Sequence, residues 1–208
     1  MKKKIAILLA IVSIFTLILS ACGKKTPIGD KSQINGEEDK LETNKEDEDK
    51  KIVRENIGVF DGITFTDEEV NNDILKENDL TMINIWATFC PPCIDEMPDL
   101  GEINREYKEA GKSFAILGIA TDVADIQGNV DERQMELAEE IIQLTNADYT
   151  HILPGEDLIK GFLYKFSAVP TTVFVNKEGD VLKTVVGARD KNAWIKIIDE
   201  VMLEVAND

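Results

Sequence analysis

The stretch Trp86-Ala-Thr-Phe-Cys-Pro-Pro-Cys93 carries most of the information about the fold of this chain of 208 residues. Two of its three cysteines, Cys90 and Cys93, lie here with two prolines between them. A cysteine pair at this spacing can be half of a zinc site, a structural disulfide or a redox-active pair. The residues around the pair and the supply of other ligands distinguish these three possibilities.

Two structural interpretations of the pair are possible, and both are weak. A structural zinc site needs four ligands, commonly two cysteine pairs or one pair with two histidines. The chain has a single histidine, His151, which we expect at the surface or at a strand edge, so we expect no metal site. A disulfide between Cys90 and Cys93 would close a very short loop, and its entropic effect on the unfolded chain would be small.

The surroundings of the pair favour redox chemistry. An apolar run of strand type, Met82–Trp86, precedes it, and apolar residues at helical spacing follow until Gly111, namely Met97, Leu100, Ile103 and Tyr107. Cys90 is therefore placed at a helix N-terminus, where free amide groups and the helix dipole stabilise a thiolate. We predict that Cys90 is the exposed attacking thiol, with a lowered pKa, and that Cys93 is the buried resolving thiol.

Strands and helices alternate along the rest of the sequence. A short hairpin with an Asp-Gly turn is expected over Val59–Phe65, followed by a helix with Thr66 as its N-cap. Phe114–Ala120 is a continuous apolar run, which suits a strand buried on both faces. Further elements are a helix around Met135–Ile142, a strand over Tyr149–Leu153, a short helix near Leu158–Phe166, a hairpin over Val173–Val186 and a closing helix over Trp194–Val205. The pattern predicts an α/β fold, with a mixed central sheet covered by helices on both faces and an N-terminal hairpin extension.

The N-terminal region has the pattern of a secretory signal. Met1–Lys4 is basic, Ile5–Leu19 is almost unbroken apolar sequence, and small residues follow, so we expect residues 1–21 to be a signal peptide. The ending Leu-Ser-Ala-Cys resembles the lipobox of bacterial lipoproteins, which implies that Cys22 is diacylated and becomes the first residue of the mature chain. The alternative is an uncleaved signal anchor. In both cases the rest of the chain is expected outside the cytoplasm.

An acidic segment separates this signal from the folded domain. Asp30–Lys50 contains nine acidic residues and four lysines and shows no apolar periodicity, which is typical of a solvated, disordered tether. We therefore expect a lipidated tether over residues 22–56 and a folded domain over residues 57–208. The chain as a whole has 40 acidic residues against 23 basic ones, a formal charge of −17. This balance argues against nucleic acid as a partner, because binding phosphate backbones requires a basic face.

The segment from Trp86 to Pro98, W-A-T-F-C-P-P-C-I-D-E-M-P, resembles the active-site segment of thioredoxin-fold proteins. More closely, it resembles that of the TlpA/ResA-like extracytoplasmic thiol-disulfide oxidoreductases. Trp86 matches the active-site tryptophan of the family, and Pro98 matches the proline that kinks the first active-site helix. Downstream, Ala168–Phe174 resembles the loop in which a cis-proline faces the disulfide. The resemblance implies a thioredoxin-like fold and a cis Pro170. It also implies that Trp86, Val169 and Pro170 form the substrate-binding surface, with the Val169 backbone pairing with the bound segment.

One position departs from the cytoplasmic thioredoxins. Their buried aspartate is replaced here by Asn84, which cannot take a proton. The branch that this chain resembles has a glutamate three residues after the second cysteine, and that residue is Glu96. We hypothesise that Glu96 is partly buried, has a raised pKa and accepts or relays the proton of Cys93. The alternative is an exposed glutamate in the first helical turn, stabilised there by the helix dipole.

The leading interpretation is a protein disulfide reductase, in which Cys90 attacks a client disulfide and Cys93 resolves the mixed disulfide. A disulfide-forming oxidase is the alternative within this class, because the C-P-P-C sequence does not determine the reduction potential. A thiol peroxidase is disfavoured, since its P-x-x-x-[T/S]-x-x-C motif would need other residues than Ile83 and Ala87. A non-catalytic surface lipoprotein is a further alternative, and its function would survive loss of either cysteine.

The resemblance also implies partners and a location. It implies that the pair is recharged by a membrane electron-transfer protein such as a CcdA-like partner, and it implies no cofactor. Clients would be apocytochrome c or oxidised surface proteins, including methionine sulfoxide reductases. The lipid on Cys22 would hold the protein at the extracytoplasmic face of a bacterial cell membrane.

Overall fold

The computed structural model describes residues 54–207. The expected signal peptide, Cys22 and residues 22–53 of the expected tether lie outside the described residues. Within residues 54–207, no helix is both long enough and apolar enough to cross a membrane. The last residues assigned to the tether belong to the folded domain, because the Glu55 carbonyl accepts a hydrogen bond from the Val181 amide and Asn56 forms a β-bridge with Asp180.

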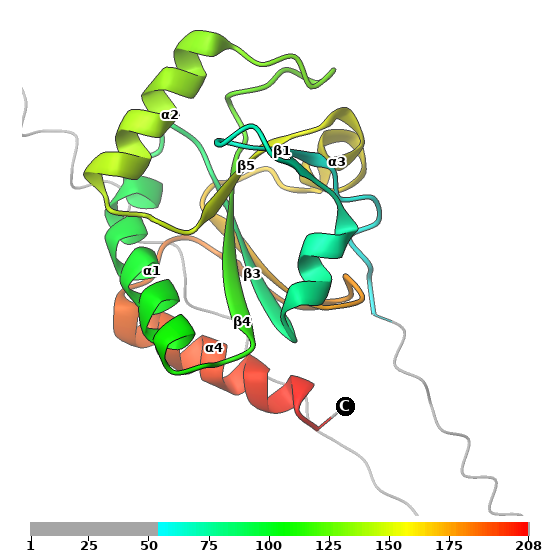
Figure 1. The fold of residues 1–208 in the computed structure, drawn as a ribbon, viewed down its shortest axis with the longest axis vertical. Coiled ribbons are helices and arrows are strands. Elements are labelled where there is room, and N and C mark those ends of the chain that lie inside the picture. The colour runs from blue at the N-terminus through cyan, green and yellow to red at the C-terminus, as the bar shows by residue number, and fades with distance from the viewer. Residues whose placement is uncertain (1–53, 208) are drawn as a thin grey trace, which may run out of the picture. The chain divides into compact units, whose positions relative to one another are not determined.

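Within the described residues, seven strands form one mixed sheet in the order β2-β1-β5-β4-β3-β6-β7 (Figure 1). Strand β3 runs parallel to β4, and β4 runs parallel to β5, whereas the pairs β3–β6, β6–β7, β1–β5 and β1–β2 are antiparallel. The strands are β1 Gly62–Thr64, β2 Glu69–Val70, β3 Leu80–Trp86, β4 Phe114–Ala120, β5 Thr150–Pro154, β6 Thr171–Asn176 and β7 Val181–Val186.

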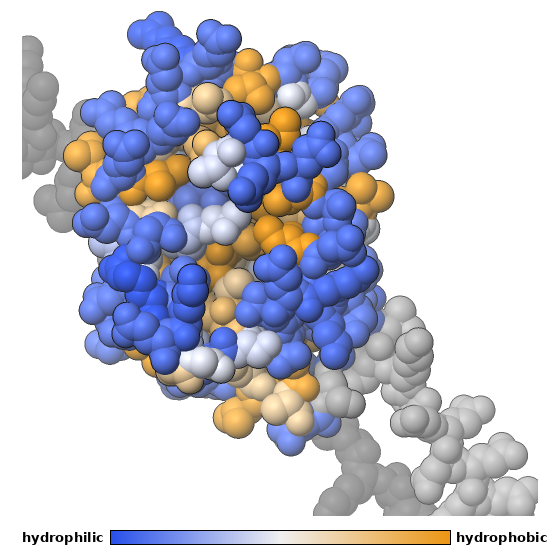
Figure 2. Space-filling model, in the orientation of Figure 1, coloured by the Kyte–Doolittle hydropathy of each residue, from blue (hydrophilic) through white to orange (hydrophobic). Residues whose placement is uncertain are grey.

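Helices cover both faces of the sheet, as predicted. The α-helices are α1 Pro91–Glu109, α2 Glu132–Leu144, α3 Glu156–Gly161 and α4 Lys191–Val205, and the 3-10 helices are η1 Asn72–Glu77 and η2 Leu163–Lys165. Helices α1 and α4 lie side by side on one face (Figure 1). Figure 2 shows a largely hydrophilic surface with small apolar areas, which agrees with the high charge content of the chain.

The side chains of β3 alternate between two cores, as the two-residue period of a strand requires. Leu80, Met82 and Trp86 pack with buried residues of α1, α2 and α4. Ile83 and Ile85 pack on the other face with residues of η1, α3 and η2. The strand that leads to the C-P-P-C segment is thus buried along its whole length.

The N-terminal hairpin is present, but its position was predicted wrongly. Gly62 does not form a turn; it opens β1, where a Cβ would lie 2.5 Å from the carbonyl oxygen of Leu153 in β5, so the close approach of the strands requires glycine. The chain turns after Thr64, and Thr66 lies in that turn instead of capping a helix. The helix begins later, at η1, with Asn71 as the N-cap.

Candidate functional site

The two cysteines of the C-P-P-C segment form a disulfide at the start of α1. Cys90 is the N-cap residue, and its Sγ accepts a hydrogen bond from the Cys93 amide at 3.3 Å. Pro91 occupies the first helical position, where its missing N–H leaves no hydrogen bond unmade. Cys93 is fully buried and Cys90 is 5% exposed. Of the two, only Cys90 reaches solvent, although it is much less exposed than predicted.

The loop between β3 and α1 is held by the end of the neighbouring strand β4. The carboxylate of Asp122 accepts hydrogen bonds from the amide of Thr88 at 3.0 Å and from its hydroxyl at 2.5 Å. The amide and hydroxyl of Thr121 both donate to the carbonyl of Trp86, at 2.9 and 3.0 Å. These contacts fix the turn that carries Cys90. We did not identify Asp122 from the sequence; its place directly after a buried strand was the one available signal.

The second loop of the site contains a cis peptide bond between Val169 and Pro170, as predicted. Thr171, the next residue, opens β6 and pairs with Ile85 near the end of β3. Pro170 therefore lies at the end of the sheet where β3 leads into the loop that carries Cys90. A cavity of about 300 Å³ has both Phe89, 73% exposed, and Val169 in its lining. The structure therefore brings the two predicted loops together at the rim of one depression.

The three residues predicted to bind substrate differ in accessibility. Trp86 is fully buried, because it ends β3 with its side chain in the core under α1, and contact of Trp86 with substrate stays a prediction. Pro170 is also buried, and its carbonyl accepts a hydrogen bond from Gly187 at 2.8 Å. Val169 is half-buried, and within residues 54–207 its backbone N–H and carbonyl make no hydrogen bond. Pairing of the Val169 backbone with substrate stays a prediction.

Glu96 is buried one helical turn after Cys93, with 2% of its surface exposed. Its Oε1 accepts a hydrogen bond from Asn84 Nδ2 at 3.0 Å, and its Oε2 accepts from the Arg189 amide at 3.1 Å and from Trp194 Nε1 at 3.2 Å. Burial raises the pKa of Glu96, and these hydrogen bonds offset part of that rise. Glu96 is thus more deeply buried than predicted, its pKa is shifted in the predicted direction, and the exposed alternative is wrong.

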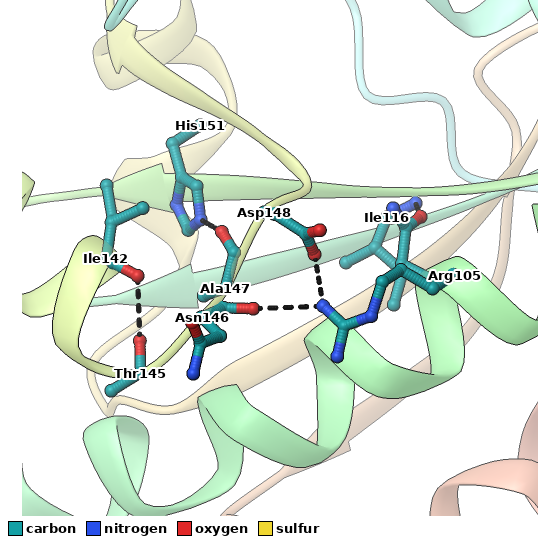
Figure 3. Close-up of polar contacts among 9 residues, drawn as sticks. Arg105, Ile116, Ile142, Thr145, Asn146, Ala147, Asp148 and His151 are labelled. Atoms are coloured by element: carbon teal, nitrogen blue, oxygen red, sulfur yellow. Dashed lines mark hydrogen bonds and ion pairs between the residues drawn. The ribbon is translucent and has the colours of Figure 1, made fainter.

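His151 lies in the core, so the prediction of a surface or strand-edge position was wrong. Its Nε2 is 3.0 Å from the carbonyl oxygen of Ala147, in the segment that joins α2 to β5 (Figure 3). Its ring stacks on Tyr149, with 4.4 Å between centroids, and meets Trp86 edge to face at 5.7 Å. Burial lowers the pKa of His151 to about 4, so the ring is neutral at pH 7. The ring fits because Gly118 has no side chain: a Cβ at this position would lie only 2.3 Å from Nδ1 of His151.

No group of three or more histidine, cysteine, aspartate or glutamate side chains in the described part of the chain is arranged to hold a metal ion. The chemistry that the arrangement offers is that of the cysteine pair. A disulfide at a helix N-terminus, near the Val169 backbone groups that make no hydrogen bond within residues 54–207 and near a buried carboxylate, can exchange with a dithiol, and its reduced form can exchange with another disulfide.

Comparisons with known proteins agree with this chemistry. The family model Redoxin matches residues 62–201. The thiol-disulfide oxidoreductase ResA of Oceanobacillus iheyensis is 30% identical over 125 residues, which is 58% of this chain and 58% of that protein. ResA of Halalkalibacterium halodurans is 25% identical over 129 residues, or 60% of this chain and 66% of that protein. The matched region thus spans less than two thirds of the length of either relative.

Solved structures show the same fold. The thioredoxin domain of a thiol-disulfide oxidoreductase from Bacteroides vulgatus has a TM-score of 0.55 at 20% identity, and the match covers 71% of this chain and 98% of that one. A thiol:disulfide interchange protein from Chlorobium tepidum has a TM-score of 0.56 at 20% identity, with 71% and 96% coverage. The predicted thioredoxin-like fold is therefore confirmed.

Proposed function

We propose that this chain, which belongs to the Redoxin family, is a TlpA/ResA-type thiol-disulfide oxidoreductase. In this role it reduces disulfides of exported proteins. The observation that carries this proposal is the Cys90–Cys93 disulfide at the N-terminus of α1, beside the loop with cis Pro170. A stabilising disulfide would not need this placement, since it links residues only three positions apart.

The reaction proceeds in two exchanges from the reduced pair. The Cys90 thiolate attacks one sulfur of a client disulfide; the client S–S bond breaks, a mixed disulfide forms, and the released client sulfur takes up a proton. Cys93 then loses its proton and attacks the sulfur of Cys90, which yields the disulfide seen in the structure and frees the second client thiol. Two electrons pass from the pair to the client. The Cys93 amide, directed at Cys90 Sγ, stabilises the attacking thiolate.

Glu96 takes the proton of Cys93 in the second exchange. Cys93 is fully buried, so its proton must pass to a group inside the protein. Glu96 lies three residues further along α1, on the same buried face, and is the carboxylate with a raised pKa there. A base with such a pKa matches proton transfer near neutral pH better than an exposed glutamate would.

The client binds as an extended segment beside Val169. The N–H and carbonyl of Val169, which make no hydrogen bond within residues 54–207, can form strand-type hydrogen bonds with such a segment. Among the described residues, none that lines the adjoining cavity of about 300 Å³ is charged, which favours uncharged side chains next to the client cysteine. Both features apply to any client with an accessible, locally unfolded disulfide.

Location, partners and direction of electron flow are part of the proposal. A lipid on Cys22 anchors the protein at the extracytoplasmic face of the membrane, as the signal pattern of residues 1–22 supports. A CcdA-like membrane protein returns electrons to the pair. Apocytochrome c and oxidised surface proteins such as methionine sulfoxide reductases are the proposed clients. The electron donor and the clients are both proposed because the C-P-P-C segment resembles that of the TlpA/ResA-like oxidoreductases.

Trapping of covalent partners tests the function. A Cys93→Ser variant expressed with its native leader should accumulate mixed disulfides through Cys90, seen as higher-mass bands that dithiothreitol removes. The matched control carries both Cys90→Ser and Cys93→Ser and should show none of these bands. Absence of trapped species from the single variant, or equal bands from the control, would contradict the proposal.

A further inference from the structure

The carboxylate of Glu96 is tied to the C-terminal helix, far away in the sequence. The indole N–H of Trp194 in α4 and the backbone N–H of Arg189 both donate to Oε2, at 3.2 and 3.1 Å. The other oxygen, Oε1, accepts one hydrogen bond, from Asn84 at 3.0 Å. Two of the three donors therefore come from α4 and the segment that leads into it.

That segment is anchored independently of the carboxylate. The guanidinium of Arg189 donates to the carbonyl groups of residues 186–188, which closes the segment on itself. One turn further along α1, Asp99 accepts a hydrogen bond from the Lys191 amide at 2.8 Å. Trp194 is thus presented to α1 by a segment with its own contacts, which makes its indole a fixed donor.

The chain has two tryptophans, and their indole N–H groups differ in whether they have a hydrogen-bond acceptor. Both rings are fully buried. Trp86 Nε1 has no hydrogen-bond acceptor within the described residues, whereas Trp194 Nε1 donates to a carboxylate. We propose that Trp194 is a positioning residue for Glu96: with the Arg189 amide it occupies Oε2, so that Oε1 is the oxygen left with capacity to accept the proton of Cys93.

The three N–H donors favour the carboxylate over the carboxylic acid, and so offset the effect of burial on Glu96. Among the described residues, the other charged or titratable groups near Glu96 are the side chain of Arg189, which also favours the carboxylate, the buried hydroxyl of Tyr149, and Cys93, three residues earlier on the buried side of α1. Loss of the indole N–H shifts the balance toward the acid, and a protonated Glu96 cannot accept a proton. This chemical consequence rests on the proposed function, but the hydrogen bond and the titration that it controls do not.

The wild-type protein offers a direct test, because its two indole N–H groups give separate NMR signals. In the oxidised protein, where neither cysteine titrates, the signal of Trp194 should move with pH along the same curve as the carboxyl carbon of Glu96. The signal of Trp86 is the internal control and should not follow that curve. A Trp194 signal that does not follow the Glu96 titration overturns the inference.

A Trp194→Phe variant removes the donor and keeps an aromatic ring. We expect the Glu96 midpoint in the oxidised protein to rise by about one pH unit, the effect of one hydrogen bond to a charged group. Phe174→Leu is the matched control, since Phe174 packs near Trp194, with 6.3 Å between ring centroids, and does not bond Glu96. An unchanged midpoint in Trp194→Phe, or an equal rise in the control, overturns the inference.

The outcome is distinguishable from failure of the proposed function. The titration is measured on the disulfide form and needs no client, so it can succeed even if no mixed disulfide is trapped. Conversely, mixed disulfides could be trapped through Cys90 while the Glu96 midpoint is the same in Trp194→Phe and in the wild type. That result would support the proposed function and contradict the role of Trp194. If Trp194→Phe does not fold, the wild-type indole titration alone decides.

Discussion

Protonation of His151 should make this domain less stable in acid. The ring is 4% exposed, and its Nε2 bonds the carbonyl of Ala147. Burial lowers its pKa from 6.5 to about 4. In the unfolded chain the ring takes up a proton near pH 6.5, whereas in the folded protein it does so only near pH 4. Between these values the unfolded state binds more protons, so the free energy of unfolding rises with pH.

The size of the effect follows from the shift. Each pH unit corresponds to 1.36 kcal/mol, so the contribution of His151 is complete above about pH 7 and falls by about 3 kcal/mol by pH 4. Glu96, whose pKa is raised, contributes with the opposite sign: the folded state keeps its proton at higher pH, so its contribution falls as pH rises. The pH dependence of the free energy of unfolding of the wild type alone therefore does not isolate the contribution of His151.

Urea unfolding of the wild type and of His151→Phe between pH 4 and 8 isolates the histidine. The difference between the two curves cancels Glu96. At pH 7 we expect the variant to be less stable by about 1 kcal/mol, because the hydrogen bond to Ala147 is lost. The curves should cross at about pH 6, and the variant should be more stable below it. A difference that is constant from pH 4 to 7 would refute the account of a buried, neutral His151.

Three further substitutions test the site and its support. Glu96→Gln should leave mixed-disulfide formation intact and slow its resolution by about 100-fold at pH 7, as stopped-flow fluorescence would show; equal rates would remove Glu96 from proton transfer. Asp122→Asn weakens the contacts to Thr88 and should lower the rate of disulfide exchange about tenfold while stability stays near that of the wild type. An unaltered rate would mean that the loop between β3 and α1 keeps its conformation without Asp122. Gly118→Ala should destabilise the fold by about 1–3 kcal/mol, and a double-mutant cycle with His151→Ala should recover most of this loss if the clash with the ring is its cause.

The elements that the sequence predicted well are those with a continuous local signal. Strand β4 matches the apolar run Phe114–Ala120 in both bounds, and α1 ends at Glu109, just before Gly111 with its φ of +66°. The place of Cys90 at a helix N-terminus followed from the same reasoning, because strand, cysteine pair and helix are contiguous. These features depend on residues within a few positions of one another.

The features that were missed depend on contacts between distant segments. The Asp-Gly pair at residues 61–62 has the composition of a turn, but Gly62 is needed for close approach to β5, which no local pattern reveals. His151 is buried because Gly118, its partner across the β4–β5 pair, leaves room for the ring. The donors to Glu96 from Arg189 and Trp194 are more than 90 residues away. Site residues that act through such contacts require the folded structure.

The reduction potential of the Cys90–Cys93 pair tests the central claim most directly. The protein would be equilibrated with defined ratios of reduced and oxidised dithiothreitol, and the fraction of disulfide would be counted by thiol alkylation and mass spectrometry. A reductase requires a potential of about −250 mV or lower, in the range of thioredoxin, and this is the value that we expect. A potential near −120 mV, typical of a disulfide-forming oxidase, or a pair that does not equilibrate with the buffer, would contradict the proposed function.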